Sequence, residues 1–232
     1  MKKLLTLTVL FFTFVFAFGQ REHKTLFDNG NLKEIGSYDE KGRRTGEWIN
    51  YFDNGKIYYV INYKNGLLSG EEKWYDINGQ LSVIKKYENG KPVGETIGYN
   101  NEGKVIYSGK YENGKKSGEW KFHHNNGQLW RIELYDENGE QTGETKAYYE
   151  NGQIHYIEQY EDGKRVGEWK IYMENGQLWQ IGKYENGKQT GEWKEYYENG
   201  QVKGIGIYES GKLKGEWKSY DEHGNLIRTD KH

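Results

Sequence analysis

Residues 167–178 have the sequence GEWKIYMENGQL, and the chain repeats this pattern every 24 residues from Gly46 onward. Only the unit that begins at Gly118 is longer, with 25 residues. The repeats open at Gly46, Gly70, Gly94, Gly118, Gly143, Gly167, Gly191 and Gly215. A fixed period of roughly 20 to 50 residues is typical of arrays in which each unit packs on its neighbours. The period therefore predicts an elongated array and not a globule around one core.

The composition also departs from that of an ordinary globule. Only 34% of the residues are hydrophobic, yet 16% are aromatic. Globular chains have roughly 45–50% apolar residues, whereas disordered chains are poor in aromatic residues. We therefore expect a thin layer whose burial depends on tyrosine and tryptophan. The formal net charge is -2 and both signs are interspersed, which excludes the basic surface typical of nucleic-acid binding.

The N-terminus differs from the repeats. Residues 1–3 include two lysines, and residues 4–18 form an apolar run. Ala17 and Gly19 supply small residues at the −3 and −1 positions of a cleavage site. The run is shorter than the about 20 residues that span a bilayer, so residues 1–19 are predicted to be a secretory signal peptide. We expect export from a bacterium, to the periplasm, the outer surface or the medium, with the array in residues 20–232.

Twelve Asn-Gly dipeptides punctuate the chain. Asn-Gly favours a two-residue type I′ turn with positive φ at both positions. Each repeat has two turn sites, which predicts one hairpin per repeat, and glycine or asparagine every few residues disfavours helix. The predicted fold is all-β, an elongated antiparallel meander in a single twisted sheet. Structural turn glycines are predicted at Gly55, Gly79, Gly103, Gly127, Gly152, Gly176 and Gly200.

Side chains alternate between the faces of a strand, so Trp169 and Met173 are predicted to share one face, which we call the Trp face. A two-residue turn at Asn175-Gly176 would pair Met173 with Leu178, and Trp169 with Gly182. The Trp face would then hold the tryptophans Trp48, Trp120, Trp169, Trp193 and Trp217, the aliphatic row Ile57, Leu81, Val105, Leu129, Ile154, Leu178 and Val202, and the tyrosine row Tyr63, Tyr87, Tyr111, Tyr135, Tyr160, Tyr184 and Tyr208.

Two stretches, YENGKKSGEW at residues 111–120 and YENGKQTGEW at residues 184–193, resemble the MORN repeat in its bacterial variant form. The resemblance covers about residues 26–232, in about eight to nine units. It implies an elongated meander of hairpins, binding of proteins or membrane lipids, and no family-wide catalytic residues. The chain is also similar to MORN-variant proteins described as antitoxins of toxin–antitoxin systems.

No catalytic, cofactor or metal site is predicted. His123 and His124 are adjacent, so on a strand they point to opposite faces and cannot share a metal ion. The chain has no cysteine. Carboxylates such as Glu174 recur equivalently in the repeats, whereas acid–base catalysis needs an unequal pair in a cleft. We therefore expect a protein that is not an enzyme and binds no cofactor.

The expected function is that of a non-enzymatic exported scaffold for protein–protein interaction or self-association. The alternatives are an antitoxin or immunity-type protein that neutralises a toxin, and a module that binds carbohydrate or the cell envelope; contact with a membrane surface also stays open. Because one sheet cannot cover its own flat faces, the candidate partner-binding aromatics are Trp48, Trp120, Trp169, Trp193 and Trp217. Packing of these rings from strand to strand is the competing interpretation.

Overall fold

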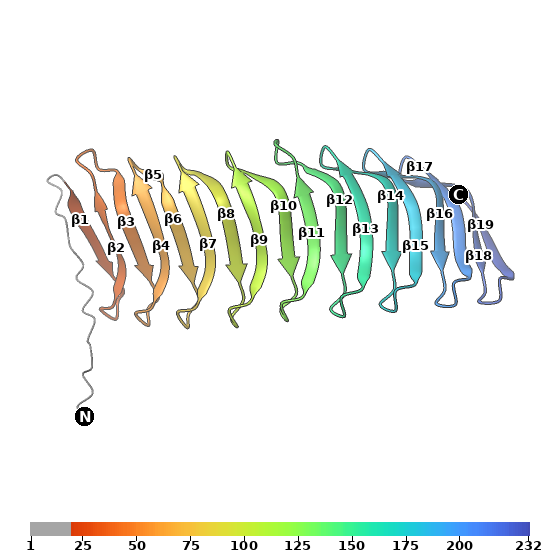
Figure 1. Ribbon diagram of the computed structural model, residues 1–232, viewed down its shortest axis with the longest axis horizontal. Coiled ribbons are helices and arrows are strands. Elements are labelled where there is room, and N and C mark those ends of the chain that lie inside the picture. Colours follow the sequence, from red (N-terminus) through yellow and green to blue (C-terminus); the bar gives the residue numbers. More distant parts are fainter. Residues whose placement is uncertain (1–19) are drawn as a thin grey trace, which may run out of the picture.

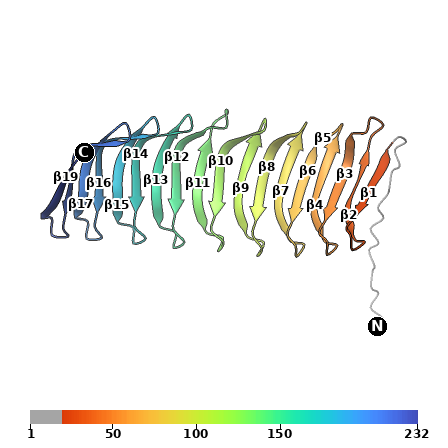
Figure 2. The same cartoon turned by 180° about the vertical axis from the view of Figure 1, so that it is seen from behind.

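The computed structural model describes residues 20–232, which form a single open antiparallel sheet of 19 strands. Each strand pairs with the next along the chain, except that β5 and β6 both pair with β4, so the sheet is a meander that runs from β1 at one end to β19 at the other (Figure 1 and Figure 2). Both views show one elongated layer of bowed strands. The predicted all-β meander of tandem hairpins is confirmed. The predicted signal peptide, residues 1–19, lies outside the described residues.

Except for the two-residue β5, the strands have six to nine residues. The first nine are β1 (Arg21–Leu26), β2 (Leu32–Tyr38), β3 (Arg44–Tyr51), β4 (Ile57–Lys64), β5 (Leu67–Leu68), β6 (Gly70–Tyr75), β7 (Leu81–Glu88), β8 (Lys91–Tyr99) and β9 (Val105–Glu112). The remaining ten are β10 (Lys115–His123), β11 (Leu129–Tyr135), β12 (Gln141–Tyr148), β13 (Ile154–Glu161), β14 (Lys164–Tyr172), β15 (Leu178–Glu185), β16 (Lys188–Tyr196), β17 (Val202–Glu209), β18 (Lys212–Tyr220) and β19 (Leu226–Lys231). The short β5 and β6 both pair with β4 and together form one rung of the sheet.

The turns lie along two sides of the sheet and differ between them. On the long-turn side, at the bottom of Figure 1, every connection has five residues. These connections span residues 27–31, 52–56, 76–80, 100–104, 124–128, 149–153, 173–177, 197–201 and 221–225. On the opposite, short-turn side, six connections have two residues, and two, at residues 39–43 and 136–140, have five.

The two-residue turns have the predicted type I′ geometry. Asn113 and Gly114 have φ angles of 51° and 88°, and Glu112 pairs with Lys115 across them. Positive φ at both positions recurs at Asn65-Gly66, Asn89-Gly90, Asp162-Gly163, Asn186-Gly187 and Ser210-Gly211. Glycine and asparagine enter this left-handed region at the lowest cost, which explains the Asn-Gly pairs on the short-turn side.

The five-residue turns have a different geometry from the one predicted. Gly176 has a φ of 85°, while Asn175 is not among the residues with positive φ. The Gly176 amide donates a hydrogen bond to the Met173 carbonyl (2.8 Å), and the Met173 amide donates to the Gln177 carbonyl (2.7 Å). The prediction of a two-residue type I′ turn at Asn175-Gly176 is therefore wrong. Positive φ values of 75–91° are found at all seven predicted turn glycines, Gly55, Gly79, Gly103, Gly127, Gly152, Gly176 and Gly200.

The longer turn also changes the strand register beside it. Trp169 lies opposite Gly182, as predicted, but Leu178 lies opposite Tyr172 and not opposite Met173. Directly opposite residues project from the same face. Leu178 therefore lies with Tyr172 on the face opposite the Trp face, and its prediction on the Trp face is wrong. The same correction applies to the whole aliphatic row, Ile57, Leu81, Val105, Leu129, Ile154, Leu178 and Val202, each of which pairs with the last residue of the preceding strand.

The face opposite the Trp face is covered by charged side chains. Lys170 lies opposite Ile181, and its ammonium pairs with the carboxylate of Glu168 at 2.6 Å. Such Glu-Lys pairs, two residues apart on one strand, recur in β6, β10, β12, β16 and β18. The lysine stems can cover apolar neighbours while the ammonium groups stay in water. No helix in residues 20–232 is long and apolar enough to cross a membrane.

Candidate functional site

Four of the five tryptophans near the start of the repeats lie over a glycine of the neighbouring strand. In β10, residues 118–120 lie opposite a single residue of β9, Gly109, because the register shifts there. Gly118 has a φ of 64°, which residues with a side chain rarely adopt, and so permits this bulge. The bulge places the indole of Trp120 over Gly109, where an added Cβ would lie 2.2 Å from the ring. Glycine at this position makes room for the ring.

The pairing of a tryptophan with a glycine on the preceding strand recurs along the sheet. It joins Trp48 to Gly36, Trp120 to Gly109, Trp193 to Gly182 and Trp217 to Gly206. The exposed fractions of Trp48, Trp120 and Trp193 are 0%, 3% and 1%. These three rings leave almost no indole surface for a partner. Their assignment to a partner surface stays a prediction, and their burial favours the competing interpretation of packing from strand to strand.

Neighbouring side chains cover each ring, as around Trp120. The ring of Tyr111 meets the indole edge-on at 5.1 Å between centroids, and the Lys116 ammonium lies 4.4 Å from the indole centroid. Burial lowers the pKa of Lys116 despite the nearby carboxylate of Glu133, which acts in the opposite direction. At Trp48 the guanidinium of Arg44 takes the same place, 3.9 Å from the indole centroid. A single sheet thus buries the rings of Trp48, Trp120 and Trp193 without a second layer.

Trp169 and Trp217 are only half-buried. Trp169 faces Glu158 where the other tryptophans face glycine, and its indole Nε1 donates to the Glu158 carboxylate at 3.0 Å. Arg165 pairs with the same carboxylate at 3.0 Å. The indole therefore cannot lie flat on the strand as Trp193 does. Of the five predicted aromatics, Trp169 and Trp217 have indole surface that a partner could reach.

Three units lack the tryptophan, and polar residues fill its place. Glu72, Thr96 and Thr145 occupy this position, and all three are buried. Thr145 lies across the bulge from Glu133, whose carboxylate accepts a hydrogen bond from Tyr135 (2.6 Å) and pairs with Arg131 (2.5 Å). Hydrogen bonds and cations therefore satisfy this buried carboxylate, which gives it a structural role.

The exposed aromatic residues stand at another position, the one after the aliphatic row. Tyr58, Trp130 and Trp179 occupy it in three repeats, with exposed fractions of 39%, 41% and 43%, and Ile227 is also exposed there. The register shift at the long turn makes this residue the extra, bulged one of its strand. Its side chain reaches the Trp face, because Tyr58 lies 5.1 Å between ring centroids from Trp74, which stands two residues after Glu72 on β6 and so shares its face. In the other repeats the position holds Ser82, Ile106, His155 and Lys203.

The bulged residue packs beside the first residue of its long turn. Ring centroids lie 4.3 Å apart for Tyr149 and His155, and burial lowers the pKa of His155, which favours its neutral form. The Tyr149 hydroxyl donates to the Tyr172 carbonyl of the next repeat at 2.8 Å, and Tyr197 makes the equivalent bond to the Tyr220 carbonyl two units later. We call the resulting stripe along the long-turn side the aromatic ledge: His124, Trp130, Tyr149, His155, Met173, Trp179, Tyr197 and Lys203.

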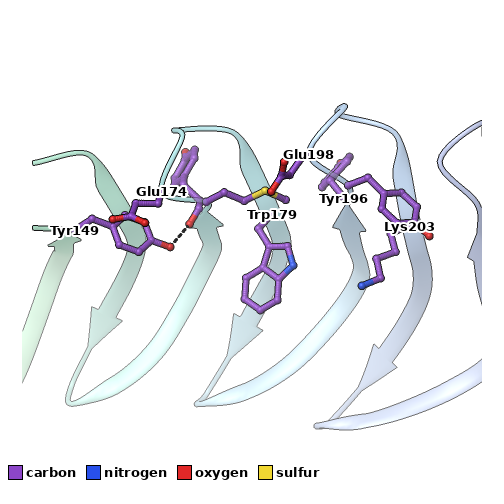
Figure 3. A pocket seen from close by; sticks show the side chains of 9 residues that line it. Tyr149, Glu174, Trp179, Tyr196, Glu198 and Lys203 are labelled. Atoms are coloured by element: carbon purple, nitrogen blue, oxygen red, sulfur yellow. Dashed lines mark hydrogen bonds between the residues drawn. The ribbon is translucent and has the colours of Figure 1, made fainter. Parts of the chain in front are cut away.

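The ledge contains a shallow, open cleft of about 430 Å³ between Trp179 and Lys203, as Figure 3 shows. Tyr196 and Tyr197 line it, and Glu174 and Glu198 stand above it in two successive long turns. The Lys203 ammonium lies 5.8 Å from the centroid of the Tyr197 ring. An exposed indole beside carboxylates can bind a ligand by stacking and by ionic hydrogen bonds. No group of three or more His, Asp or Glu side chains suited to a metal ion is found within residues 20–232.

Trp130 and Trp179 were not among the predicted contacts. A signal for them exists in the sequence, since Gly-Gln-Leu-Trp occurs at residues 127–130 and again at 176–179, while other repeats change the fourth residue. A position that varies among repeats of one array is not needed to build the array. The bulge that turns this position toward the Trp face breaks the alternation on which the prediction relied.

Comparisons with solved structures give only distant likenesses. A chain of the GtfA/B complex bound to UDP and GlcNAc is 16% identical, with a TM-score of 0.21 over 50% of this chain and 23% of the other. A chain of the TcdB2–TccC3–Cdc42 complex is 14% identical, with a TM-score of 0.19 over 89% of this chain and 14% of the other. A porin-like protein from Bacteroides uniformis is 9% identical, with a TM-score of 0.23 over 91% of this chain and 94% of the other. The chain thus spans less than a quarter of the first two structures, and TM-scores this low carry no argument. A search of curated proteins found no match.

The family comparison agrees with the repeat pattern. The model of the MORN repeat variant matches residues 44–65, 68–89, 116–137, 141–162, 165–186, 189–210 and 213–230, more than half of the chain. MORN repeats are a non-catalytic repeat type and commonly act as scaffolds that bind proteins or membranes. With its meander of tandem hairpins, the chain belongs to the MORN repeat variant family.

Proposed function

We propose that the protein is an exported, non-enzymatic scaffold that binds a partner protein through the aromatic ledge. The observation that carries this proposal is the contrast between two sets of tryptophans. Trp120 and Trp193 are buried against glycine, whereas Trp130 and Trp179 are more than 40% exposed at a position that varies among the repeats. Exposed aromatic rings on a rigid frame are typical of the centres of protein interfaces.

A pull-down from the native cell envelope tests the proposal. The purified chain is compared with a Trp130→Ser, Trp179→Ser double variant, which should still fold because each tryptophan is more than 40% exposed and stands at a position that varies among the repeats. We expect the wild type to retain a protein that the variant loses. The matched control replaces two apolar residues outside the ledge that are at least as exposed, Leu67→Ser and Ile207→Ser, and should retain the same protein.

Three outcomes would contradict the proposal. One is equal capture by the wild type and the ledge variant. Another is capture of the chain by a second copy, which analytical ultracentrifugation detects as a dimer. The third is binding to a glycan array without binding to any protein, which would support the carbohydrate-binding alternative. A toxin retained through the ledge would be one form of the proposed partner and would favour the antitoxin alternative.

The proposed export has its own test. The basic start and the apolar run in residues 1–19 support it. N-terminal sequencing of the protein recovered from the producing bacterium should begin at Gln20, and the protein should fractionate outside the cytoplasm. Recovery of the intact N-terminus from the cytoplasm would overturn this part of the proposal and leave the binding role untouched.

A further inference from the structure

We propose that the aromatic ledge binds an extended peptide segment with a lysine or arginine at every third residue, lying along the long axis of the sheet. This inference rests on the proposed protein-binding function and names the chemistry of the partner. Three features of the ledge lead to it, namely the charge of its rim, the exposed rings beneath that rim, and the spacing of the repeats.

The rim is acidic. The long turns at residues 149–153, 173–177 and 197–201 each contribute one exposed glutamate, and none of them contains a lysine or arginine. The glutamates are Glu150, Glu174 and Glu198. Elsewhere on the surface, glutamates such as Glu168 pair with a lysine of the same strand. The rim is therefore a local negative stripe on a chain of nearly balanced charge, and it complements a basic partner.

The rings below the rim suit cations. The indole of Trp179 is 43% exposed, and together with Tyr197 it lines the cleft. An ammonium or guanidinium over an aromatic face, within about 6 Å of its centroid, is attracted by the ring. The ledge already shows such a contact, since Lys203 places its ammonium 5.8 Å from the Tyr197 centroid. A ligand cation beside Trp179 would have a ring on one side and a carboxylate on the other.

The spacing of the repeats sets the period of the ligand. Each repeat adds two strands, and neighbouring strands lie about 4.8 Å apart, so equivalent ledge residues recur about every 10 Å. A polyproline II peptide advances about 3.1 Å per residue with three residues per turn. A basic residue at every third position therefore places all its cations on one side of the peptide, about 9 Å apart. The ledge from His124 to Lys203 covers four repeats, which corresponds to a peptide of about ten residues.

Substitution of Lys203 tests whether the ledge prefers a cationic ligand. It occupies the position that Trp179 and Trp130 occupy in other repeats, and its charge opposes a cationic ligand at that end of the cleft. Replacement Lys203→Met removes the charge and keeps an unbranched apolar stem. Because Lys203 is exposed, the substitution should leave the sheet intact while it strengthens binding of a basic peptide.

The test uses fluorescence anisotropy with labelled twelve-residue peptides made of lysine, proline and alanine. One peptide carries lysine at every third position, and the control peptide has the same composition with its lysines grouped at one end. We expect the period-three peptide to bind about tenfold more tightly, as several cation–π and ionic contacts add. Binding should weaken about tenfold in a Glu174→Gln, Glu198→Gln variant and in Trp179→Ser, strengthen several-fold in Lys203→Met, and fall with salt.

The matched control is Glu168→Gln with Glu192→Gln, which removes two charges one repeat apart on the opposite face and should not change the affinity. Equal binding of both peptides, or equal losses in the ledge and control variants, would overturn the inference. Binding to vesicles of anionic lipid or to a glycan array, without binding to the peptide, would overturn it as well. A ledge-dependent protein retained in the pull-down without affinity for the peptide would leave the proposed function standing and refute this chemistry alone.

Discussion

Two pairs of neighbouring strands fill the space above the same bulge with different residues. Between β9 and β10, the large indole of Trp120 lies over Gly109, which has no side chain. Between β11 and β12, the small Thr145 lies across the same bulge from Glu133, whose side chain occupies the space. Both central residues are buried, with exposed fractions of 3% for Trp120 and 0% for Thr145.

The comparison shows that two different pairs of residues can fill the space above the same bulge. A ring over glycine and a carboxylate beside threonine fill the same space above the bulge. The apolar pair gains from removal of a large ring from water, whereas the polar pair depends on full satisfaction of a buried carboxylate by Tyr135 and Arg131. We therefore expect substitutions to destabilise the two kinds of unit for different reasons. Three experiments examine this difference.

The largest effect on stability is expected when the glutamate of the polar pair is placed across from the tryptophan of the apolar pair. Gly109→Glu alone forces a side chain into the space of the Trp120 ring and should cost about 4–5 kcal/mol, because the ring is displaced and a carboxylate enters among aromatic residues. The double variant Gly109→Glu, Trp120→Thr copies the Glu133 and Thr145 pair and should recover a part of that loss. Denaturant unfolding of the double-mutant cycle measures the coupling.

In that experiment the exposed Lys110→Glu variant is the control, since it adds the same side chain one residue away on the other face. If the losses of the two single substitutions simply add in the double variant, the complementarity of volume between the two positions is refuted. Hydrogen exchange resolved by repeat should place the lost protection in β8 to β11, because contacts join only neighbouring strands.

A smaller difference in stability is expected between substitutions of two tryptophans at the same repeat position. Trp193 lies over Gly182 and is 1% exposed, whereas Trp169 faces Glu158 and is half-buried. Trp193→Ala should cost about 3–5 kcal/mol, the usual range for loss of a buried ring, and Trp169→Ala should cost less. Thermal or denaturant unfolding of both variants under the same conditions gives the ranking. Equal losses would show that the glycine beneath the ring does not matter.

The smallest effect concerns alkaline pH and the polar units. Burial, together with the nearby carboxylate of Glu72, raises the pKa of Tyr87 to about 12, above the ordinary value near 10. The neutral phenol is favoured in the folded state, so this stability is intact below pH about 10 and is lost as the pH rises toward about 12. Tyr87→Phe should reduce the alkaline loss, measured by unfolding at a series of pH values. If the variant lost stability over the same pH range as the wild type, Tyr87 would not be the cause of the alkaline loss.

The sequence predicted much of the fold because turn chemistry is local. Asn113-Gly114 specifies its type I′ turn through two residues whose backbones accept positive φ. The same dipeptide at Asn175-Gly176 closes a five-residue turn in which only the glycine is left-handed. The difference comes from the pairing of the flanking strands, which a dipeptide cannot express. The resulting slip moved the row of Leu178 to the other face and made Trp179 a bulged residue.

By itself, the sequence determined the period, the hairpin in each repeat, the pairing of Trp169 with Gly182 and the family of the chain. All of these depend on spacings along the chain that stay the same from unit to unit. Only the tertiary structure decided which aromatic rings are covered and which are free. Trp193 and Trp179 are the same kind of residue in the same array, yet a glycine on the preceding strand buries one, and a bulge at the start of its strand exposes the other. Burial depends on what lies across the sheet, and that partner is set by register, which is a property of two strands together.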